Sequence, residues 1–540
     1  MPMTIGEKIT WLRTSADISQ EQLAEKISVS RQAVSKWEMD QSLPQIDKVL
    51  QLCELFGISA DALLRDEICL RSDEEKNKKN KYFGTDGFRG EANVGLTSVQ
   101  AYKVGRFLGW YFSSSLSGCG NSGYRPRIVI GKDTRRSSYM LEYSIAAGIT
   151  ASGADAYMLH VTTTPSVSYV TRQDEFDCGI MITASHNPYY DNGIKVINKY
   201  GEKLDDNTTA LIESYLDGDF SSLGLSGDLP FATGDRIGRI VDYSSGRNRY
   251  LGYLISLASN SYKDLKIGLD CANGASWMIA KSVFGALGAQ TVVIGAEPDG
   301  LNVNNGCGST HIEKLQDLVR EKHLDCGFAF DGDADRCIAV DENGNVIDGD
   351  IMLYILGKRL KSRGMLSKDT VVTTVMSNSG LAESFSETGI KSIQTKVGDR
   401  FVYECMQKGG YSLGGEQSGH IILKKYATTG DGILTAIMLT EEICDSKLSL
   451  AELAEGVSIY PQALKNVRVV DKDAVLGDAE VQKAVKSAER EIGGKGRILL
   501  RPSGTEPLIR IMAECQSEEK CKEYTELIAD VISERGYSID

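Results

Sequence analysis

The chain has 540 residues and a formal net charge of −14, with 41% hydrophobic and 25% charged residues. These fractions exclude a disordered, collagen-like or disulfide-scaffold protein, and at roughly 150 residues per domain the length predicts about three to four domains. Fifty-five glycines against ten prolines are typical of α/β enzymes with many tight loops. The negative charge argues against a protein that coats nucleic acid or an anionic membrane.

Three features of the sequence indicate where in the cell the protein is located: the apolar runs, the N-terminal segment and the cysteines. There is no apolar run long enough for a transmembrane helix, so no membrane partner is expected. The N-terminal MPMTIGEKITWLRTS lacks the apolar core of a secretory signal. Twelve cysteines without a CxxC pair predict a cytoplasmic protein and no zinc site.

Residues 1–66 have apolar residues at helical spacing and predict a small all-α domain of about five helices. Ser19 with Gln22 matches a capping box, and Ser30 is placed to cap a second helix, RQAVSKWE, after a tight turn. Two short helices joined in this way predict a helix-turn-helix. The polar, charged segment that follows predicts a linker over 67–81.

The segment from Ser19 to Ser59 resembles the Cro/C1-type repressor family. The resemblance implies that DNA is a partner of residues 1–66 and that four side chains face its major groove: Arg31, Gln32, Ser35 and Lys36. The same residues 1–66 contain seven Lys/Arg against ten Asp/Glu, whereas phosphate contacts normally supply much of the affinity for DNA. A helical docking module is therefore the alternative, and specific binding to DNA would need a dimer.

From residue 82 onward, apolar runs recur before Gly- or Asp-rich loops, at 127–134, 178–188, 266–275, 326–336 and 371–380. We expect each run to be a strand followed by a helix, which is typical of parallel-sheet domains with functional groups at the carboxyl ends of strands. The stretch from about 460 to 540 predicts a smaller α+β domain.

The first motif with a chemical pattern is TASHNPYYDNGIKV, residues 183–196. Ser185 follows an apolar strand, His186 is adjacent, and two turns return Lys195 to the same loop. A serine hydroxyl is a weak nucleophile unless it is activated or carries a transferable group. The alternative is a strand followed by an ordinary capped turn.

The second motif is DGDADR, residues 331–336, in which Asp331, Asp333 and Asp335 alternate and would point to one side of an extended loop. Three crowded carboxylates repel one another unless a cation neutralises them, and hard oxygen ligands suit Mg²⁺ or Ca²⁺. An EF-hand is excluded because Arg336 stands where that loop needs glycine and the flanks are β-like. Three protein ligands leave room for a substrate phosphate, which is usual for Mg²⁺; a solvated acidic turn is the alternative.

Three further motifs offer groups that bind sugars or anions. GGEQSGH (414–420) presents Glu416, Ser418 and His420 in alternation, which suits sugar hydroxyls. In RPSGTEPLIR (501–510), the expected anion cradle consists of Arg501, Ser503, Gly504 and Thr505, with Arg510 nearby. YFGTDGFRG (82–90) places Arg89 in a Gly-rich loop. Taken singly, these motifs also fit a glycine-rich hairpin or ordinary turns.

In this order and spacing the five motifs resemble the α-D-phosphohexomutase superfamily over about 82–540. The resemblance implies three related α/β domains and a smaller α+β domain around one cleft: domain I (82–240, with a phosphoserine), domain II (241–345, with the metal loop), domain III (346–457, with the sugar-binding loop) and domain IV (458–540, binding phosphate). Gln417 and the segment NNGCGSTHIEKL (304–315) are similar to the phosphoglucosamine mutase branch. Ala334 differs, because that branch more often has glycine there.

The resemblance implies interconversion of glucosamine 6-phosphate and glucosamine 1-phosphate through a phosphoserine at Ser185 and an enzyme-bound bisphosphate, with a sugar bisphosphate as activator. It implies Mg²⁺ held by Ser185, Asp331, Asp333 and Asp335. The expected catalytic residues are Ser185, His186, Lys195 and Arg336, with Lys195 as general base. The expected substrate-binding residues are Arg89, Glu416, Ser418, His420, Arg501, Ser503, Gly504, Thr505 and Arg510.

Two alternatives stay open at this point. The substrate of a phosphomannomutase or phosphoglucomutase is the first, and a sugar-phosphate-sensing transcription regulator is the second. A family member that had lost its catalytic activity would be expected to lose Ser185 or one of the three aspartates first. All four residues are present, which favours an active isomerase. We expect a monomer or a homodimer.

Overall fold

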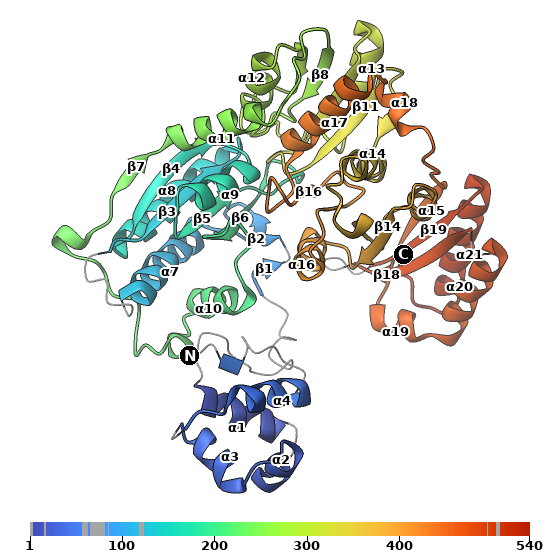
Figure 1. The fold of residues 1–540 in the computed structure, drawn as a ribbon. Coiled ribbons are helices and arrows are strands. Elements are labelled where there is room, and N and C mark those ends of the chain that lie inside the picture. Colours follow the sequence, from blue (N-terminus) through green and yellow to red (C-terminus); the bar gives the residue numbers. More distant parts are fainter. Residues whose placement is uncertain are drawn as a thin grey trace. The chain divides into compact units, whose positions relative to one another are not determined.

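The chain forms two compact units, Met1–Lys81 and Tyr82–Asp540, each described here by itself (Figure 1). The computed structural model describes residues 4–15, 18–40, 42–56, 63–64, 81–84, 86–117, 124–493, 495–503 and 508–539. Within these ranges no helix combines the length and apolar character that crossing a bilayer requires.

The first unit is helical, as predicted. Its described helices are α1 (Ile5–Ser15), α2 (Gln20–Lys26), α3 (Arg31–Glu38) and α4 (Ile46–Phe56). The Ser30 hydroxyl accepts a hydrogen bond from the Ala33 amide and caps α3, and Ser19 and Gln22 exchange the two hydrogen bonds of a capping box before α2. Val34 and Trp37 of α3 are buried in the small core between the helices. The predicted helix-turn-helix is confirmed.

The second unit begins with a seven-stranded sheet in the order β1-β2-β6-β5-β3-β4-β7. Alternate residues of β3 enter different cores: Ile128 and Ile130 pack with α7 and α8, and Val129 packs with α9, so helices cover both faces. The strands are β1 (Phe83–Gly84), β2 (Gly87–Glu91), β3 (Arg127–Lys132), β4 (Asp155–Val161), β5 (Cys178–Ile182), β6 (Asp191–Asn198) and β7 (Ile240–Asp242). The helices are α7 (Ser98–Ser117), α8 (Arg136–Ala151), α9 (Thr164–Gln173), α10 (Asp206–Leu216), η1 (Ser221–Leu223), η2 (Gly234–Arg236) and α11 (Ser244–Ser256).

The second and third sheets have five and four strands, in the orders β12-β11-β10-β8-β9 and β14-β13-β15-β16. They share one hydrophobic core, in which Phe330, Leu353 and Ile437 are buried together. The strands are β8 (Lys266–Asp270), β9 (Gln290–Ile294), β10 (Cys326–Phe330), β11 (Cys337–Asp341), β12 (Val346–Ile347), β13 (Thr370–Thr374), β14 (Lys391–Thr395), β15 (Leu413–Gly415) and β16 (Ile421–Leu423). The helices are α12 (Ile279–Ala286), α13 (Glu313–Lys322), α14 (Gly349–Ser362), η3 (Ser367–Asp369), α15 (Ser379–Glu387), α16 (Asp399–Gly409), α17 (Gly432–Ser446) and α18 (Leu450–Ala454).

The last part is the smaller α+β domain that the sequence predicts. Its antiparallel sheet has the order β17-β19-β18, with β17 (Gln462–Arg468), β18 (Gly496–Pro502) and β19 (Leu508–Cys515). Its helices are α19 (Lys472–Gly477), α20 (Ala479–Ile492) and α21 (Glu518–Glu534). The Ser379 amide donates to Glu514, which ties this domain to α15.

The expectation that every strand is followed by a helix is wrong at two places. β5 is followed by the antiparallel strand β6, and β10 by the antiparallel strand β11. The third sheet repeats the arrangement with β15 and β16. Each of the three related sheets therefore ends its parallel strands in a hairpin, and these three hairpins carry the serine, aspartate and glycine-rich motifs.

Candidate active site

Ser185 lies in the loop of the first hairpin, directly after the buried strand β5. Its backbone has φ +53°, a left-handed conformation that is uncommon for a residue with a side chain. Its hydroxyl donates a hydrogen bond of 2.5 Å to Asp331 Oδ2 and lies 3.2 Å from His186 Nδ1. The structure thus brings the predicted serine against the predicted metal loop.

Two residues that the motifs did not single out fix the serine loop. The Arg135 guanidinium donates to the carbonyl oxygens of Ser185 and Asn187 at 3.1 and 2.6 Å, and the Asn304 amide donates to the same two carbonyls at 2.8 and 3.0 Å. The metal loop presses on this loop as well, because a Cβ at Gly332 would lie 2.5 Å from the Ser185 carbonyl oxygen. The signal for Arg135 was its position just after β3, at the carboxyl edge of the sheet.

The three aspartates converge, as predicted, with potential ligand atoms all within 4.8 Å of one another. The reason we gave was wrong: the loop is a turn, with Ala334 at φ +56°, and not an extended segment. Glycine is favoured at such a φ, so glycine in place of Ala334 would fit the same turn.

The electrostatics of the triad fit a cation. Burial, followed by the charges of Asp335 and Asp333, raises the pKa of Asp331 well above its ordinary value. Oδ1 of Asp333 and Oδ1 of Asp335 are buried and accept no hydrogen bond from the described residues. Buried carboxylate oxygens without a donor are costly unless a cation takes that place, so this donor set suits a hard divalent ion.

Lys195 reaches the triad from β6. Its Nζ lies 2.8 Å from Asp333, 3.1 Å from Asp335 and 3.5 Å from Asp86. Burial alone would lower the pKa of Lys195, but its attraction to Asp333, Asp335 and Asp86 outweighs burial and raises the pKa well above the ordinary value. The side chain is an ammonium in this arrangement, and the predicted role as general base would require it to release a proton.

His186 and Arg336 flank the reacting position. Burial, and then the charges of Arg336 and Arg89, lower the pKa of His186 to about 4, so its imidazole is neutral at pH 7. Burial alone would lower the pKa of Arg336, but Asp331 and Asp335 raise it. The site therefore holds a neutral imidazole next to the serine hydroxyl and a guanidinium next to the aspartates.

Arg89 lies in strand β2, not in the loop that we expected. Its backbone is opposite Gly193 of β6, and its guanidinium pairs with Asp86 and reaches Asn187 Oδ1 at 3.3 Å. The pairing of β2 with β6 therefore holds the backbone of Arg89 in place beside the serine loop.

The glycine-rich loop between β15 and β16 is also a turn, so the expected alternation along one side is wrong. His420 is buried, with Nε2 3.0 Å from the Gly430 amide nitrogen and Nδ1 3.7 Å from Asp335 Oδ1. Burial alone would lower the pKa of His420, but Asp335 and then Asp399 raise it to about 9. Glu416 is half-buried and accepts a hydrogen bond from the Gly398 amide, and Ser418 is half-buried.

In the smaller domain, Arg501 and Arg510 are direct cross-strand partners on β18 and β19. Burial, and then the charge of Arg510, lower the pKa of Arg501. The Ser503 amide donates to the Leu508 carbonyl, which joins the end of β18 to the start of β19 beside them. Gly504 and Thr505, predicted for the same cradle, lie outside the described residues. Two adjacent guanidiniums beside a hydroxyl suit an anion.

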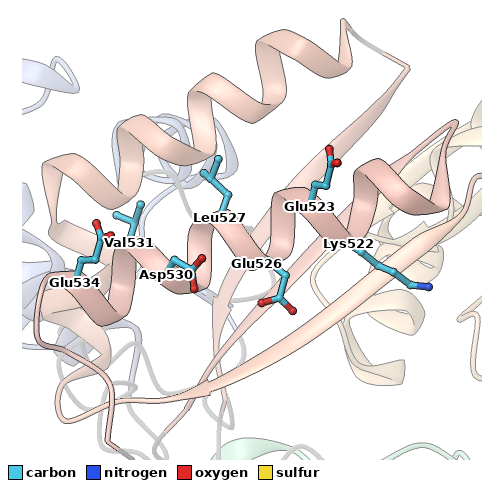
Figure 2. A pocket seen from close by; sticks show the side chains of 7 residues that line it. All are labelled: Lys522, Glu523, Glu526, Leu527, Asp530, Val531 and Glu534. Carbon is cyan, nitrogen blue, oxygen red and sulfur yellow. The ribbon is translucent and has the colours of Figure 1, made fainter.

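The hollow along α21 in the same domain is lined by acidic rather than basic side chains. Figure 2 shows its seven lining residues on this helix: Lys522, Glu523, Glu526, Leu527, Asp530, Val531 and Glu534. Four carboxylates against one lysine repel a phosphate dianion. The candidate phosphate site is thus the Arg501–Arg510 pair.

In the first unit, the predicted DNA-contacting residues lie on α3. Arg31, Gln32 and Lys36 are exposed and Ser35 is half-exposed, whereas Val34 and Trp37 of the same helix face the core. Arg31 forms an exposed ion pair with Glu21 at 2.8 Å. The helix presents one polar face to solvent.

Family models described as phosphoglucomutase/phosphomannomutase domains I, II, III and IV match residues 80–221, 248–344, 348–460 and 464–531. A helix-turn-helix model matches residues 9–63. Among solved structures, a phosphoglucomutase/phosphomannomutase family protein of Burkholderia thailandensis has a TM-score of 0.68 at 22% identity and covers 85% of this chain and 100% of its own. A fungal N-acetylphosphoglucosamine mutase, from Aspergillus fumigatus in complex with GlcNAc-6P and magnesium, has a TM-score of 0.60 at 18% identity, covering 85% and 97%.

The chain belongs to the phosphoglucomutase/phosphomannomutase family, with a helix-turn-helix domain at its N-terminal side. Within the family, it is 59% identical over 459 residues to the phosphoglucosamine mutase of Lachnospira eligens, covering 85% of this chain and 100% of that protein. It is 48% identical to the phosphoglucosamine mutase of Bacillus subtilis, covering 84% and 99%.

Proposed function

We propose that this chain is a cytoplasmic isomerase that interconverts glucosamine 6-phosphate and glucosamine 1-phosphate, with Ser185 carrying the phosphoryl group between the two positions. The observation that carries the proposal is the 2.5 Å hydrogen bond between the Ser185 hydroxyl and Asp331 inside the buried aspartate triad. The identity to phosphoglucosamine mutases supports the choice of sugar.

Mg²⁺ is the cation we propose for the site, held by Asp331, Asp333, Asp335 and an oxygen at Ser185. When bound, it neutralises charge on the phosphoryl group that is transferred. Oδ1 of Asp333 and Oδ1 of Asp335 accept no hydrogen bond from the described residues, and His420 Nδ1 lies 3.7 Å from the latter, so both oxygens can take a cation.

The transfer itself is a pair of displacements at phosphorus. The bond between Ser185 Oγ and phosphorus breaks as the free hydroxyl of the hexose monophosphate bonds to that phosphorus. The sugar hydroxyl gives up its proton and Ser185 Oγ takes one up, which yields a serine hydroxyl and a bound bisphosphate. After the sugar reorients, the bond between its other oxygen and phosphorus breaks as Ser185 Oγ bonds to that phosphorus; Ser185 Oγ gives up its proton and the sugar oxygen takes one up. A free sugar bisphosphate would reload an unphosphorylated Ser185, which is why we expect it to act as an activator.

The protein's own groups contribute position and charge, because phosphoryl transfer offers little covalent assistance. Arg336 stabilises negative charge beside the triad. Neutral His186 and the Lys195 ammonium are the groups we assign to accepting and donating the proton of the sugar hydroxyl. His186 is neutral at pH 7, so its ring nitrogen is open to a proton, and its pKa of about 4 makes it a weak base.

The remaining predicted residues bind the substrate in this proposal. Glu416, Ser418 and His420 bind the hydroxyl groups of the sugar ring, and Arg89 binds the substrate next to the serine loop. The anion cradle of Arg501, Ser503, Gly504, Thr505 and Arg510 holds the phosphate that is not reacting. Arg501 and Arg510 support this part, because cross-strand guanidiniums concentrate positive charge at one point.

A coupled assay on the 6-phosphates of glucosamine, glucose and mannose, with magnesium and with or without a hexose bisphosphate, tests the proposal. We expect kcat/KM to be highest for glucosamine 6-phosphate by about tenfold or more, since a site built for one polar substituent rejects its replacement. A preference for glucose or mannose would show a phosphoglucomutase or phosphomannomutase instead. No turnover of any of the three, with the serine phosphorylated, would favour a sensor.

We further propose that residues 1–66 bind DNA as part of a dimer, because the polar face of α3 points away from the core. Selection of DNA sequences with the full chain at moderate salt tests this. We expect a preferred sequence whose enrichment is lost in Arg31→Ala/Lys36→Ala, with mutase activity unchanged. Absence of any sequence preference would leave the helices as a docking module.

A further inference from the structure

Two charged residues outside the five motifs, Lys203 and Asp399, face each other across domains I and III. Lys203 follows β6, where a bridge to Ile197 folds the segment back on that strand, and Asp399 is the first residue of α16. Lys203 Nζ lies 2.7 Å from Asp399 Oδ2 and 3.1 Å from Asp86 Oδ1. Neither residue touches the aspartate triad directly in the contacts described.

These two side chains complete a closed ring of acidic and basic groups in alternation. The ring consists of Asp86, Lys195, Asp335, His420, Asp399 and Lys203. Successive members lie 3.5, 3.1, 3.7, 3.7, 2.7 and 3.1 Å apart, counted from the Asp86–Lys195 pair and back to Asp86.

The ring draws on all three α/β domains, and Lys203–Asp399 is the only direct link between domains I and III within it. Lys195 of domain I and His420 of domain III both reach Asp335 of domain II. Without the Lys203–Asp399 link, Asp335 alone would join these two groups, and one shared carboxylate does not fix where each of them lies around it. Asp86 would also lose one of its three cations and draw more strongly on Lys195.

We propose that Lys203 and Asp399 are positioning residues of the phosphoryl transfer, which hold Lys195 and His420 at fixed places on either side of Asp335. The inference rests on the proposed function for the reaction it serves, but the placement of His420 is open to measurement without turnover. An error of about 1 Å in such a placement can cost about a hundredfold in rate.

The test compares Lys203→Met, Asp399→Asn, the double variant and Lys203→Arg. The matched control is Arg400→Met, which breaks another ion pair between the same two domains, Arg400–Asp206 at 2.5 Å, outside the ring.

We expect Lys203→Met and Asp399→Asn each to lower kcat about tenfold or more while KM changes less than about threefold. The double variant should be no worse than the stronger single one, because both remove the same link. Lys203→Arg should regain most of kcat, and Arg400→Met should stay within about twofold of the unmodified chain.

The second readout is the ring resonance of His420 in protein labelled at its five histidines, with His420→Gln to assign it. We expect Lys203→Met to shift this resonance and Arg400→Met to leave it in place. An unshifted resonance in Lys203→Met, equal losses of kcat in Lys203→Met and Arg400→Met, or additive losses in the double variant would each overturn the inference. If the unmodified chain turns over no hexose phosphate, the proposed function fails. The His420 resonance then tests by itself whether Lys203 and Asp399 position His420.

Discussion

Replacing Ser185 with alanine should lower turnover by about a thousandfold or more, because a step that depends on a covalent carrier has no other route of similar barrier. Ser185 Oγ donates a 2.5 Å hydrogen bond to Asp331. The Thr164 hydroxyl also bonds to the triad, at Asp333, but it lies at the start of α9 and not in the serine loop. The loop around Ser185 should stay in place, because Arg135 and Asn304 hold its backbone carbonyls and not its side chain. The coupled assay with glucosamine 6-phosphate measures the loss.

The matched control for this prediction is Ser144→Ala, which removes a hydroxyl that donates to the Met140 carbonyl within α8. We expect Ser144→Ala to retain full turnover and both variants to melt near the unmodified chain. Turnover by Ser185→Ala within about tenfold of the unmodified chain would remove Ser185 as the carrier.

Replacing Lys195 with methionine should lower both activity and stability. The ammonium is buried and compensates Asp333, Asp335 and Asp86, and removing one partner of such a group costs about 3–5 kcal/mol in other proteins because the remaining charges stay buried. In metal-free buffer we therefore expect a clear fall in the melting temperature of the second unit. Turnover should fall by about a hundredfold or more, since the group is also assigned to proton transfer.

Magnesium separates these two effects of Lys195→Met. A divalent cation in the triad replaces the lost positive charge, so we expect it to raise the melting temperature of the variant more than that of the unmodified chain while turnover stays low. Lys199→Met, an exposed lysine of the same segment, is the control and should change neither quantity. A variant as stable as the control in metal-free buffer would contradict the role we give to Lys195 in compensating the triad.

The sequence predicts which loops meet at the candidate site, because these loops are continuous segments. Ser185 and Lys195 lie in one motif, and the three aspartates in another, and the rule that functional groups follow buried strands placed both at sheet edges. What the rule could not show is that each loop is the turn of a hairpin. Short apolar runs such as Cys337–Asp341 do not reveal by periodicity whether they are strand or helix.

Residues that reach the site from distant segments were beyond the sequence for a physical reason. Arg135 reaches the serine loop from another strand end of domain I, and Asn304 reaches it from domain II. Lys203 meets Asp399 only after domains I and III pack together. Each is an ordinary polar residue in its own local context, and its partner depends on the packing of strands and domains, which local spacing does not encode.

The central claim is that Ser185 carries the phosphoryl group, and intact-mass measurement with peptide mapping tests it most directly. The full chain is incubated with a hexose bisphosphate and magnesium, beside Ser185→Ala treated in the same way. The account predicts one added phosphoryl group, mapped to Ser185 and removed again by glucosamine 6-phosphate, and none on Ser185→Ala. An unmodified mass, or the same gain on both proteins, would contradict it.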